Sequence, residues 1–501
     1  MKKQIKYIVI AAVLLAVLVG ALIFLLTLPD KKDDNSGVSS DTATTLIAQT
    51  ASNIEQITVK NSGGEYTLTV YNATVESLVE SSGETSVETT TEAVYTMQGY
   101  ENYFVDQDKV DSLAYDCSNL VSSKTINSKN NSDSDYGLDE PRAVVNIRFS
   151  DGSEKTVKVG SNAPGDESVY VRMGDGEKIY LVSADSVKSM LVEKLQMFDK
   201  TVLKELEDDE TVSALSISGS GRKTPLLLEK NSFSSVSDYY MTSPQRAACD
   251  KTAFSELCEQ SIFPITADST VAVDVTDEQI KKYGLDNPYY ILEASTDIAS
   301  YKVLVSKPDK DKNCYIMKDG SKAVFKIASS EIEFMGSDGS DIMSKTVIYP
   351  NIIKLKNIEV LYDKTTDKYD ITNKSSKNSD NAEYITSTVK LNEADIKSGI
   401  FSAFLRNLSV LERSSKIPKY DEKSSPILSV TVTYNNDTKD TVAIYKSEKK
   451  AVVVLNGKAV GTAELEIANE LLSDAKLLAV NTEFDSLITE EEASESKEAS
   501  V

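Results

Sequence analysis

A six-residue frame that occurs twice most constrains what this chain can fold into. It reads Tyr136-Gly137-Leu138-Asp139-Glu140-Pro141 and returns as Tyr283-Gly284-Leu285-Asp286-Asn287-Pro288. Gly takes positive φ without a steric penalty, while Pro fixes its own φ and biases the residue before it toward extended geometry. The frame therefore predicts a tight turn. We interpret the following residues as a structural turn motif: Tyr136, Gly137, Leu138, Asp139, Pro141, Tyr283, Gly284, Leu285, Asp286 and Pro288.

The segments around each frame are also shared. Short apolar strands separated by Asp-Gly turns follow both frames, at 144–149, 157–160, 170–173 and 179–182, and at 290–292, 301–305, 315–317 and 324–327. A helix with apolar residues at i, i+3 and i+4 spacing is predicted before each frame, over Val110, Leu113, Ala114, Cys117, Leu120 and Val121, and over Phe254, Leu257 and Cys258. One module is used more than once.

The first two copies are each predicted to end in a helix and a shared tripeptide. The first closing helix covers Val187, Met190, Leu191 and Leu195, and the second, shorter one covers Ile332 and Met335. Lys200-Thr201-Val202 and Lys345-Thr346-Val347 then close the copies. A third, degenerate copy carries Lys419-Tyr420-Asp421 where the turn is expected, strands at 427–432, 441–445 and 452–455, and a last helix that Thr462 can cap.

The sequence thus predicts an α+β protein with mainly antiparallel sheets in three tandem modules after an N-terminal transmembrane helix. The expected parts are 1–28 (cytoplasmic start and membrane helix), 29–50 (linker), 51–205, 206–350 and 351–480 (repeats), and 481–501 (acidic disordered tail). Residues 75–92 form an acidic insertion with Glu at every fourth place. Because like charges at that spacing destabilise a helix, we expect a solvated loop or an extended arm there.

The N-terminal segment has the features of a membrane anchor. The run Tyr7–Leu28 is uncharged and follows Lys2, Lys3 and Lys6. A helix of that length crosses the about 30 Å hydrocarbon core. The positive-inside rule places the N-terminus in the cytoplasm and the later modules outside. A cleaved signal peptide is the competing interpretation, but its apolar core would be unusually long, and no small-x-small cleavage site follows it.

Charge and composition exclude several function classes. The formal net charge of −24 argues against nucleic acid and against an anionic membrane surface as partners. The chain has no His, which removes His-based acid–base chemistry and the commonest transition-metal ligand. The four cysteines form no Cys-x-x-Cys pair, so we interpret Cys117, Cys249, Cys258 and Cys314 as core or incidental thiols.

No motif for a cofactor or catalytic site stands out. Asp309-x-Asp311-x-Asn313 begins like a calcium loop but has Cys314 at the sixth position and Gly320 at the twelfth. We expect surface turns at this loop and at 336–341, a hairpin turn at 219–221, and turn-stabilising roles for Asp139 and Asp286. We therefore predict no cofactor and no metal.

The opening hairpins, the segment Tyr240-Met241-Thr242-Ser243-Pro244, the turn motif with its strands and the Lys-Thr-Val tripeptides together resemble a bacterial family known as domain of unknown function 4340. The resemblance covers most of residues 51–350 and, more weakly, 351–480. It implies a single N-terminal membrane helix and, for some members, a place beside ABC transporters of the gliding-motility type. No catalytic residue is attached to that family, so the resemblance implies none here.

Two functions follow as hypotheses. The first is a non-enzymatic extracytoplasmic protein, anchored in the cell membrane through Tyr7–Leu28, that binds an ABC transporter or an envelope component. The alternative is a cell-surface hydrolase with an unrecognised carboxylate or Ser–Lys site. A deep pocket that gathers carboxylates from distant positions would favour the hydrolase.

Overall fold

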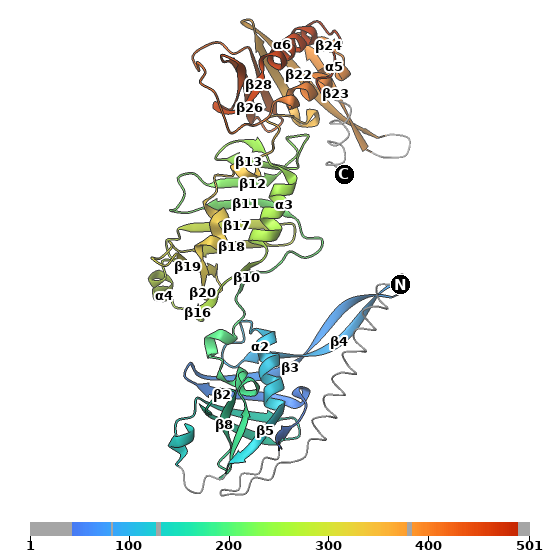
Figure 1. Cartoon of the computed structure of the whole chain (residues 1–501). Helices are drawn as coiled ribbons and strands as arrows, with labels where there is room; N and C mark the ends of the chain where they lie inside the picture. Colours follow the sequence, from blue (N-terminus) through green and yellow to red (C-terminus); the bar gives the residue numbers. More distant parts are fainter. Residues whose placement is uncertain (1–42, 82–83, 127–131, 378–382, 489–501) are drawn as a thin grey trace, which may run out of the picture. The chain divides into compact units, whose positions relative to one another are not determined.

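A computed structural model describes residues 43–81, 84–126, 132–377 and 383–488 (Figure 1). Antiparallel sheets and short helices make up these residues, so the expected α+β class is confirmed. Within the described ranges, no helix combines the length and the apolar character needed to cross a membrane. The predicted anchor Tyr7–Leu28 and residues 489–501 of the predicted tail lie outside those ranges.

The chain divides into two compact units. The first contains residues up to Glu65 and Asp111–Leu191, and the second contains Tyr66–Val110 and Val192 onward. This division differs from the three predicted modules at 51–205, 206–350 and 351–480. Whether each of those modules folds alone stays a prediction.

The first unit is built on antiparallel strands in the order β1-β5-β9-β8-β7-β6-β2. Helix α2 (Gln107–Ser118) contributes its residues from Asp111 onward to this unit. The strands are β1 (Thr44–Ala48), β2 (Ile54–Asn61), β5 (Asn119–Ile126), β6 (Ala143–Phe149), β7 (Glu154–Asn162), β8 (Ser168–Met173) and β9 (Ile179–Ser183), with 3-10 turns η1 (Ala51–Asn53), η2 (Asp133–Tyr136), η3 (Asp185–Val187) and η4 (Ser189–Leu191).

The second unit opens with a long hairpin, β3 (Gly64–Ser81) and β4 (Glu84–Met97), in which Leu68 faces Met97. The described residues of the acidic insertion, 75–81 and 84–92, lie in these two strands and are extended. The turn η5 (Lys194–Met197) and the two-stranded pair of β10 (Thr201–Leu203) and β15 (Ile265–Thr266) follow. Two larger sheets make up the rest of the unit.

The middle sheet has the order β14-β13-β12-β11-β17-β18-β19-β20-β16. Helix α3 (Lys251–Leu257), continued by the π-turn η6 (Cys258–Ile262), lies beside it, and α4 (Asp277–Lys282) precedes the second turn motif (Figure 1). Its other elements are β11 (Val212–Ser218), β12 (Leu226–Lys230), β13 (Tyr239–Ser243), β14 (Ala247–Ala248), β16 (Ser269–Ala272), β17 (Tyr290–Thr296), β18 (Ser300–Val305), β19 (Asn313–Lys318), β20 (Val324–Ala328), η7 (Ser329–Gly336) and η8 (Ser340–Ile342).

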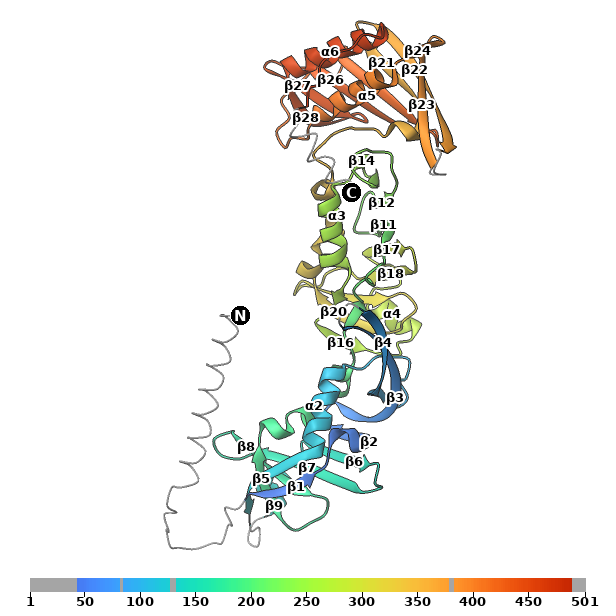
Figure 2. The same ribbon diagram turned by 90° about the vertical axis from the view of Figure 1, so that its right-hand side faces the viewer.

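The last sheet has the order β24-β23-β22-β21-β25-β26-β27-β28. Helices α5 (Ser398–Asn407) and α6 (Leu465–Ala479) contact each other and cover one of its faces (Figure 2). Its other elements are η9 (Ile352–Lys354), β21 (Leu355–Tyr362), β22 (Thr365–Lys377), β23 (Glu383–Leu391), β24 (Ala394–Ile396), η10 (Leu408–Val410), β25 (Leu428–Tyr434), β26 (Lys439–Lys446), β27 (Lys450–Leu455) and β28 (Lys458–Glu464).

The same strand order recurs three times. The runs β2-β6-β7-β8-β9, β11-β17-β18-β19-β20 and β21-β25-β26-β27-β28 each join the first strand of a copy to the strands after its turn. Burial alternates along some of these strands, as in β6, where every second residue from Ala143 to Phe149 is buried, whereas Ala451 to Leu455 of β27 are all buried. Alternation places one face of a strand against an apolar core, and an unbroken buried run is covered on both faces.

Several predicted helices differ from the structure. The short one over Ile332 and Met335 is the 3-10 segment η7, in which Ile332 has non-helical φ and ψ. The helix after Asp106 ends at Ser118, so Leu120 lies in β5 and Val121 is exposed. The helix expected over Val187, Met190, Leu191 and Leu195 is a series of 3-10 turns, and Leu195 is exposed. Ser and Asp side chains in that stretch compete with helical hydrogen bonding, and Ser189 Oγ donates to Asp116 Oδ2 at 2.5 Å instead. Thr462 caps no helix, because β28 continues to Glu464.

The boundary of the predicted disordered tail also differs. Phe484 and Leu487 pack against the core of the second unit, and Leu487 N–H donates to Asn407 Oδ1 at 3.1 Å. The residues after Asn481 are therefore fixed on the last sheet's helices up to at least Leu487. Hydrogen bonds of Lys397 N–H to Asn481 Oδ1 at 2.9 Å and of Asn407 Nδ2 to the carbonyl of Asp485 at 3.0 Å act together with these two apolar side chains.

Candidate functional site

The first turn motif is the end of a short helix. Gly137 takes φ 65° and caps the 3-10 turn η2. Its N–H donates to the carbonyl of Ser134 at 3.3 Å, and Leu138 N–H donates to the carbonyl of Asp133 at 3.0 Å. This pair of hydrogen bonds is the Schellman pattern, in which a left-handed residue closes a helix. The predicted tight turn with positive φ at Gly is confirmed.

The second turn motif repeats this geometry after α4. Gly284 has φ 70°, and its N–H donates to the carbonyl of Lys281 at 3.0 Å. Leu285 N–H donates to the carbonyl of Ile280 at 3.1 Å, and both side chains join the same small apolar cluster. A contact between these two positions commonly accompanies a Schellman cap. The Leu of the motif is therefore an anchor for the turn.

The Tyr of the motif packs against a second Tyr in a neighbouring strand, edge-on in the first copy and with tilted rings in the second. The ring centroids of Tyr136 and Tyr170 are 4.9 Å apart, and those of Tyr283 and Tyr315 are 4.8 Å apart. Tyr170 lies in β8 and Tyr315 in the equivalent strand β19. In the degenerate third copy Tyr420 packs at 5.3 Å against Tyr445 in β26, which is the equivalent of the strand before β8. The motif thus fixes a helix end on its sheet.

Among the described residues, no hydrogen bond or ion pair is found for the side chain of the motif's acidic residue, Asp139 or Asp286, so the expected turn-stabilising role is not seen. Asp139 and Asp286 are exposed, as are Glu140 and Asn287, whereas Pro141 and Pro288 are half-buried at the start of the next strand. A different carboxylate, Asp133, pairs with Arg172, whose Nη1 donates to Asp133 Oδ2 at 2.6 Å. Hydrogen bonding from Arg172 lowers the pKa of Asp133. Asp133 precedes the frame, so the repeated pattern gave no reason to single it out.

The Lys-Thr-Val tripeptides begin the next copy and do not close their own. The strand β10 pairs with β15, with Thr201 opposite Thr266. Residues 345–347 pair in the same way with the segment after α5: Thr346 faces Glu412, and Val347 N–H donates to the carbonyl of Leu411 at 2.8 Å. The predicted closing role is corrected, because backbone pairing to the following copy decides where these strands belong.

The first copy has an equivalent strand without the tripeptide. In the first unit β1 pairs with β5, the strand that follows α2, and Thr44 faces Ser122. In all three copies, then, a strand that comes before the copy completes the segment that follows its helix. We call β1, β10 and residues 345–347 the clasp strands. Thr44-Thr45-Leu46 shares too little with Lys-Thr-Val for the sequence to reveal this.

A buried polar group joins the middle sheet to the last sheet within the second unit. Asp440, which is 1% exposed, accepts from Tyr240 Oη at 2.7 Å, from Arg246 Nε at 2.8 Å and from Asn456 Nδ2 at 2.9 Å. Burial favours a lowered pKa for Arg246, but the hydrogen bonds and charge of Asp440 raise it overall. Burial raises the pKa of Tyr240 well above its ordinary value, so Tyr240 stays a neutral donor. We call these four residues the Asp440 cluster.

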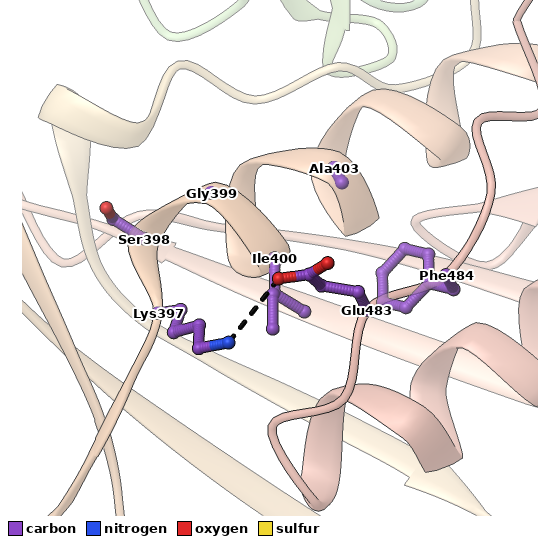
Figure 3. Close-up of a pocket in the computed structure, with 7 residues that line it drawn as sticks. All are labelled: Lys397, Ser398, Gly399, Ile400, Ala403, Glu483 and Phe484. Atoms are coloured by element: carbon purple, nitrogen blue, oxygen red, sulfur yellow. Dashed lines mark hydrogen bonds and ion pairs between the residues drawn. The ribbon is translucent and has the colours of Figure 1, made fainter.

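A cavity of about 570 Å³ lies at the start of α5 (Figure 3). Lys397 Nζ and Glu483 Oε1 face each other across it at 3.4 Å, while Ile400 and Phe484 form an apolar wall. Ser398 points away from Lys397, so these neighbours do not form a Ser–Lys dyad (Figure 3). The cavity joins the C-terminal segment to α5 and presents no nucleophile with an adjacent base.

A larger cavity, of about 910 Å³, lies within the second unit. Five aromatic side chains line it: Tyr103, Phe104, Phe198, Tyr301 and Phe325. Charged residues also line it: Asp199, Lys204, Glu205, Glu207, Glu210, Asp274, Lys318, Asp319 and Lys322. It therefore gathers carboxylates from distant positions, which the repeat pattern could not predict, because most of them lie in connecting segments and turns.

Glu210 is held as a fixed anion in this cavity. Its Oε1 accepts from Thr296 Oγ1 at 2.5 Å and from Tyr301 Oη at 2.9 Å, and its Oε2 accepts from Glu207 N–H at 3.2 Å. Burial favours a raised pKa, but these hydrogen bonds outweigh it and lower the pKa of Glu210. A general acid needs the opposite shift. The carboxylate acts as a structural acceptor.

The remaining candidates behave as turns and core residues. Asp309 Oδ1 accepts from the N–H groups of Asp311 at 2.8 Å and Asn313 at 2.9 Å, as in an Asx turn. Gly221 N–H donates to the carbonyl of Tyr289 at 2.8 Å, so the 219–221 turn lies next to the second motif. Over the described ranges, no three His, Cys, Asp or Glu side chains are placed to hold a metal ion. All four cysteines are buried free thiols, and burial raises the pKa of Cys314 to about 11.

Comparison with known proteins identifies one family. The family model described as a domain of unknown function (DUF4340) matches the chain twice, over residues 96–288 and over 240–428. The two matches start in equivalent places, at the end of β4 and at β13, and each extends past a helix and a turn position into the following copy. No curated protein matches the chain.

Proposed function

Because the chain belongs to the DUF4340 family, whose model covers it in two copies, we propose that it works as a non-enzymatic repeat scaffold. In this proposal Tyr7–Leu28 anchors the chain in the cell membrane and the three repeats lie outside the cytoplasm. The scaffold binds a membrane or envelope partner, such as an ABC transporter. Its acidic surface keeps it away from nucleic acid and from anionic lipid.

The clasp strands carry the proposal. Each repeat is completed by backbone pairing with the strand that precedes it, as at Thr201–Thr266 and Thr346–Glu412. The Asp440 cluster adds an ion pair between the middle and last sheets in which Asp440 is buried and Arg246 is partly exposed. The clasp strands and the Asp440 cluster thus serve the joining of one repeat to the next. A chain built in this way supplies an ordered surface for a partner without requiring a catalytic centre.

Topology is the first test. Protease added to intact protoplasts should digest the repeats and leave a membrane-bound stub that contains Tyr7–Leu28. The positive-inside rule gives this expectation, since the lysines precede the apolar run. Repeats that stay protected until the membrane is permeabilised would contradict it.

Partner binding is the second test. A photoreactive amino acid placed at exposed aromatic positions in both units, Tyr115 and Tyr384, should give discrete crosslinked products in native membranes. The same label at the buried position Phe401 is the control and should give none. A chain that gives no product at any exposed position in its native membrane would leave the scaffold without a partner.

The hydrolase alternative is favoured by one observation, the carboxylates of the 910 Å³ cavity. A glycoside hydrolase would need one of them to act as a general acid with a raised pKa. Glu210, the most buried of them, has a lowered pKa and three donors. Assays of the purified chain on cell-wall polymers, with Glu207→Gln and Glu210→Gln as comparisons, test this alternative. Activity that both substitutions abolish would replace the scaffold proposal.

A further inference from the structure

The 910 Å³ cavity has the size and lining of a binding site. Ligand sites usually have volumes of about 300–1,000 Å³ and combine aromatic walls with a few polar groups. All lining residues belong to the same compact unit, 66–110 with 192–501. Two segments line it side by side. One is residues 102–104, and the other is the clasp strand β10 with the acidic residues Glu205, Glu207 and Glu210 that follow it. The cavity is therefore part of the repeat junction that the proposed scaffold uses.

One aromatic ring that lines the cavity, that of Phe104, is largely exposed to solvent. Phe104 is 72% exposed, the most of any large apolar side chain in the described ranges. Its backbone is held, because Asp199 N–H donates to its carbonyl at 3.0 Å, and the adjacent Val105 bridges to Phe198. A fixed, exposed aromatic ring beside a cavity is a common anchor for a partner side chain.

The rings of the cavity already accept cations. Lys204 Nζ lies 4.8 Å from the centroid of the Phe104 ring, and Lys318 Nζ lies 5.6 Å from that of Tyr301. Aromatic faces attract ammonium and guanidinium groups through the ring quadrupole. A ligand with similar cationic groups can take these positions in place of the flexible lysines.

The net negative charge of the residues that line the cavity favours a positively charged ligand. Six acidic residues face three lysines: Asp199, Glu205, Glu207, Glu210, Asp274 and Asp319 against Lys204, Lys318 and Lys322. Asp199 and Glu210 are occupied by internal donors, such as Thr201 Oγ1 at 2.8 Å from Asp199 Oδ1. Among the described residues, no hydrogen bond or ion pair holds the side chains of the other four carboxylates. The cavity therefore offers acceptors for a positively charged partner.

We propose that this cavity binds an extended segment of a partner polypeptide that carries lysine or arginine side chains. Its basic groups pair with Glu205, Glu207, Asp274 and Asp319, and one of them or an apolar neighbour lies on the exposed Phe104 ring. The charge of the whole chain, −24, speeds the approach of a basic segment. The inference rests on the proposed scaffold function and names the chemistry of its partner.

The chain offers a direct reporter for this test, because it contains no Trp. Phe104→Trp places a single Trp at the cavity mouth and keeps an aromatic ring there. Its fluorescence is followed while a short extended peptide of alternating Lys and Leu is added to the full chain in detergent. We expect a saturable shift of the emission that weakens as salt is raised. The same peptide with acetylated lysines should give no shift.

Matched substitutions locate the binding. In the Trp reporter, the triple change Glu205→Gln, Asp274→Asn and Asp319→Asn should weaken peptide binding at least about ten-fold. The control Glu256→Gln, Glu422→Gln and Glu448→Gln alters three exposed carboxylates elsewhere and should change it less than about two-fold. Equal effects of the two sets, or no saturable shift with the basic peptide, would overturn the inference.

Two further arms separate the possible failures. Choline is titrated into the same reporter, and if it binds as tightly as the peptide, the site is a small-amine site and the polypeptide assignment is wrong.

In native membranes, a photoreactive amino acid at position 104 is compared with the labels at Tyr115 and Tyr384. Products from Tyr115 or Tyr384 alone leave the scaffold function intact and overturn the cavity assignment. Absence of products at all three positions contradicts the scaffold itself.

Discussion

Val347 donates its backbone N–H to the carbonyl of Leu411 at 2.8 Å, which joins the start of the third repeat to the segment that follows its helix. The neighbouring carbonyl of Lys345 accepts from Arg413 N–H at the same distance. Leu411 is fully buried, so its carbonyl has no access to bulk water if the bond is lost. The clasp strand is therefore a stabilising part of the fold.

The first prediction tests this clasp. Val347→Pro removes the donor and should lower the free energy of unfolding by about 1–3 kcal/mol, because the Leu411 carbonyl is left without its partner. Urea unfolding of the full chain followed by circular dichroism measures the loss. Lys345→Pro is the control, since Lys345 contributes its carbonyl to the pairing. Equal stability of the two variants would mean that the Val347 hydrogen bond to Leu411 does not stabilise the fold.

The second prediction concerns the Asp440 cluster. Asp440→Asn should cost about 3 kcal/mol, because the partly buried charge of Arg246 loses its buried counter-ion. Replacing both members, Arg246→Met with Asp440→Leu, should cost less than the sum of the two single changes. Chemical denaturation of the native chain, of Arg246→Met, of Asp440→Leu and of the double variant gives the coupling energy. Additive losses would show that the two side chains do not interact in solution.

The third prediction compares the two turn motifs. Both glycines have positive φ, which strains any residue with a Cβ. A Cβ on Gly137 would lie 2.9 Å from the backbone N of Ser161, whereas one on Gly284 would meet only Ser306 Cβ at 3.8 Å. Gly284→Ala should therefore cost about 1 kcal/mol, and Gly137→Ala should cost about 2–3 kcal/mol. Thermal unfolding of the two variants checks the order, and a larger loss at Gly284 would contradict it.

The sequence predicted the repeat well and the junctions poorly. The turn motif, the strands after it and the burial of Cys117, Cys249, Cys258 and Cys314 follow from local rules of φ, alternation and hydrophobicity. The Asp440 cluster depends on tertiary pairing between residues far apart in the sequence, and no periodic pattern marks it. Lys-Thr-Val was visible as a repeat, but only backbone pairing shows which copy it belongs to.

The cavity residues lacked a signal for a related physical reason. Phe104, Glu205 and Asp274 lie in connecting segments, where the chain follows its neighbours and no strand or helix period applies. The exposed aromatic ring of Phe104 looks like an ordinary core residue in the sequence. Phe484 and Leu487 show the opposite case, because they pack on the core although the acidic, Ser-rich stretch around them predicts disorder. The composition of these segments therefore did not predict where their side chains lie.

The last prediction concerns pH. Burial raises the pKa of Asp474, although Asn407 Nδ2 donates to its Oδ2 at 2.8 Å. The folded state thus binds this proton more tightly than the unfolded chain does, so the carboxyl favours folding at low pH and opposes it as pH rises through its folded pKa. Asp474→Asn keeps the acceptor and removes the charge, so its gain in stability over the native chain should grow from pH 4 to pH 7.

The control variant is Asp133→Asn, which should show the opposite pH dependence. Arg172 lowers the pKa of Asp133, so the stability lost with that charge should be largest at pH 7 and should shrink at low pH. Urea unfolding at several pH values measures both differences. A stability difference for Asp474→Asn that is constant with pH would show that this carboxyl titrates alike in the folded and unfolded states.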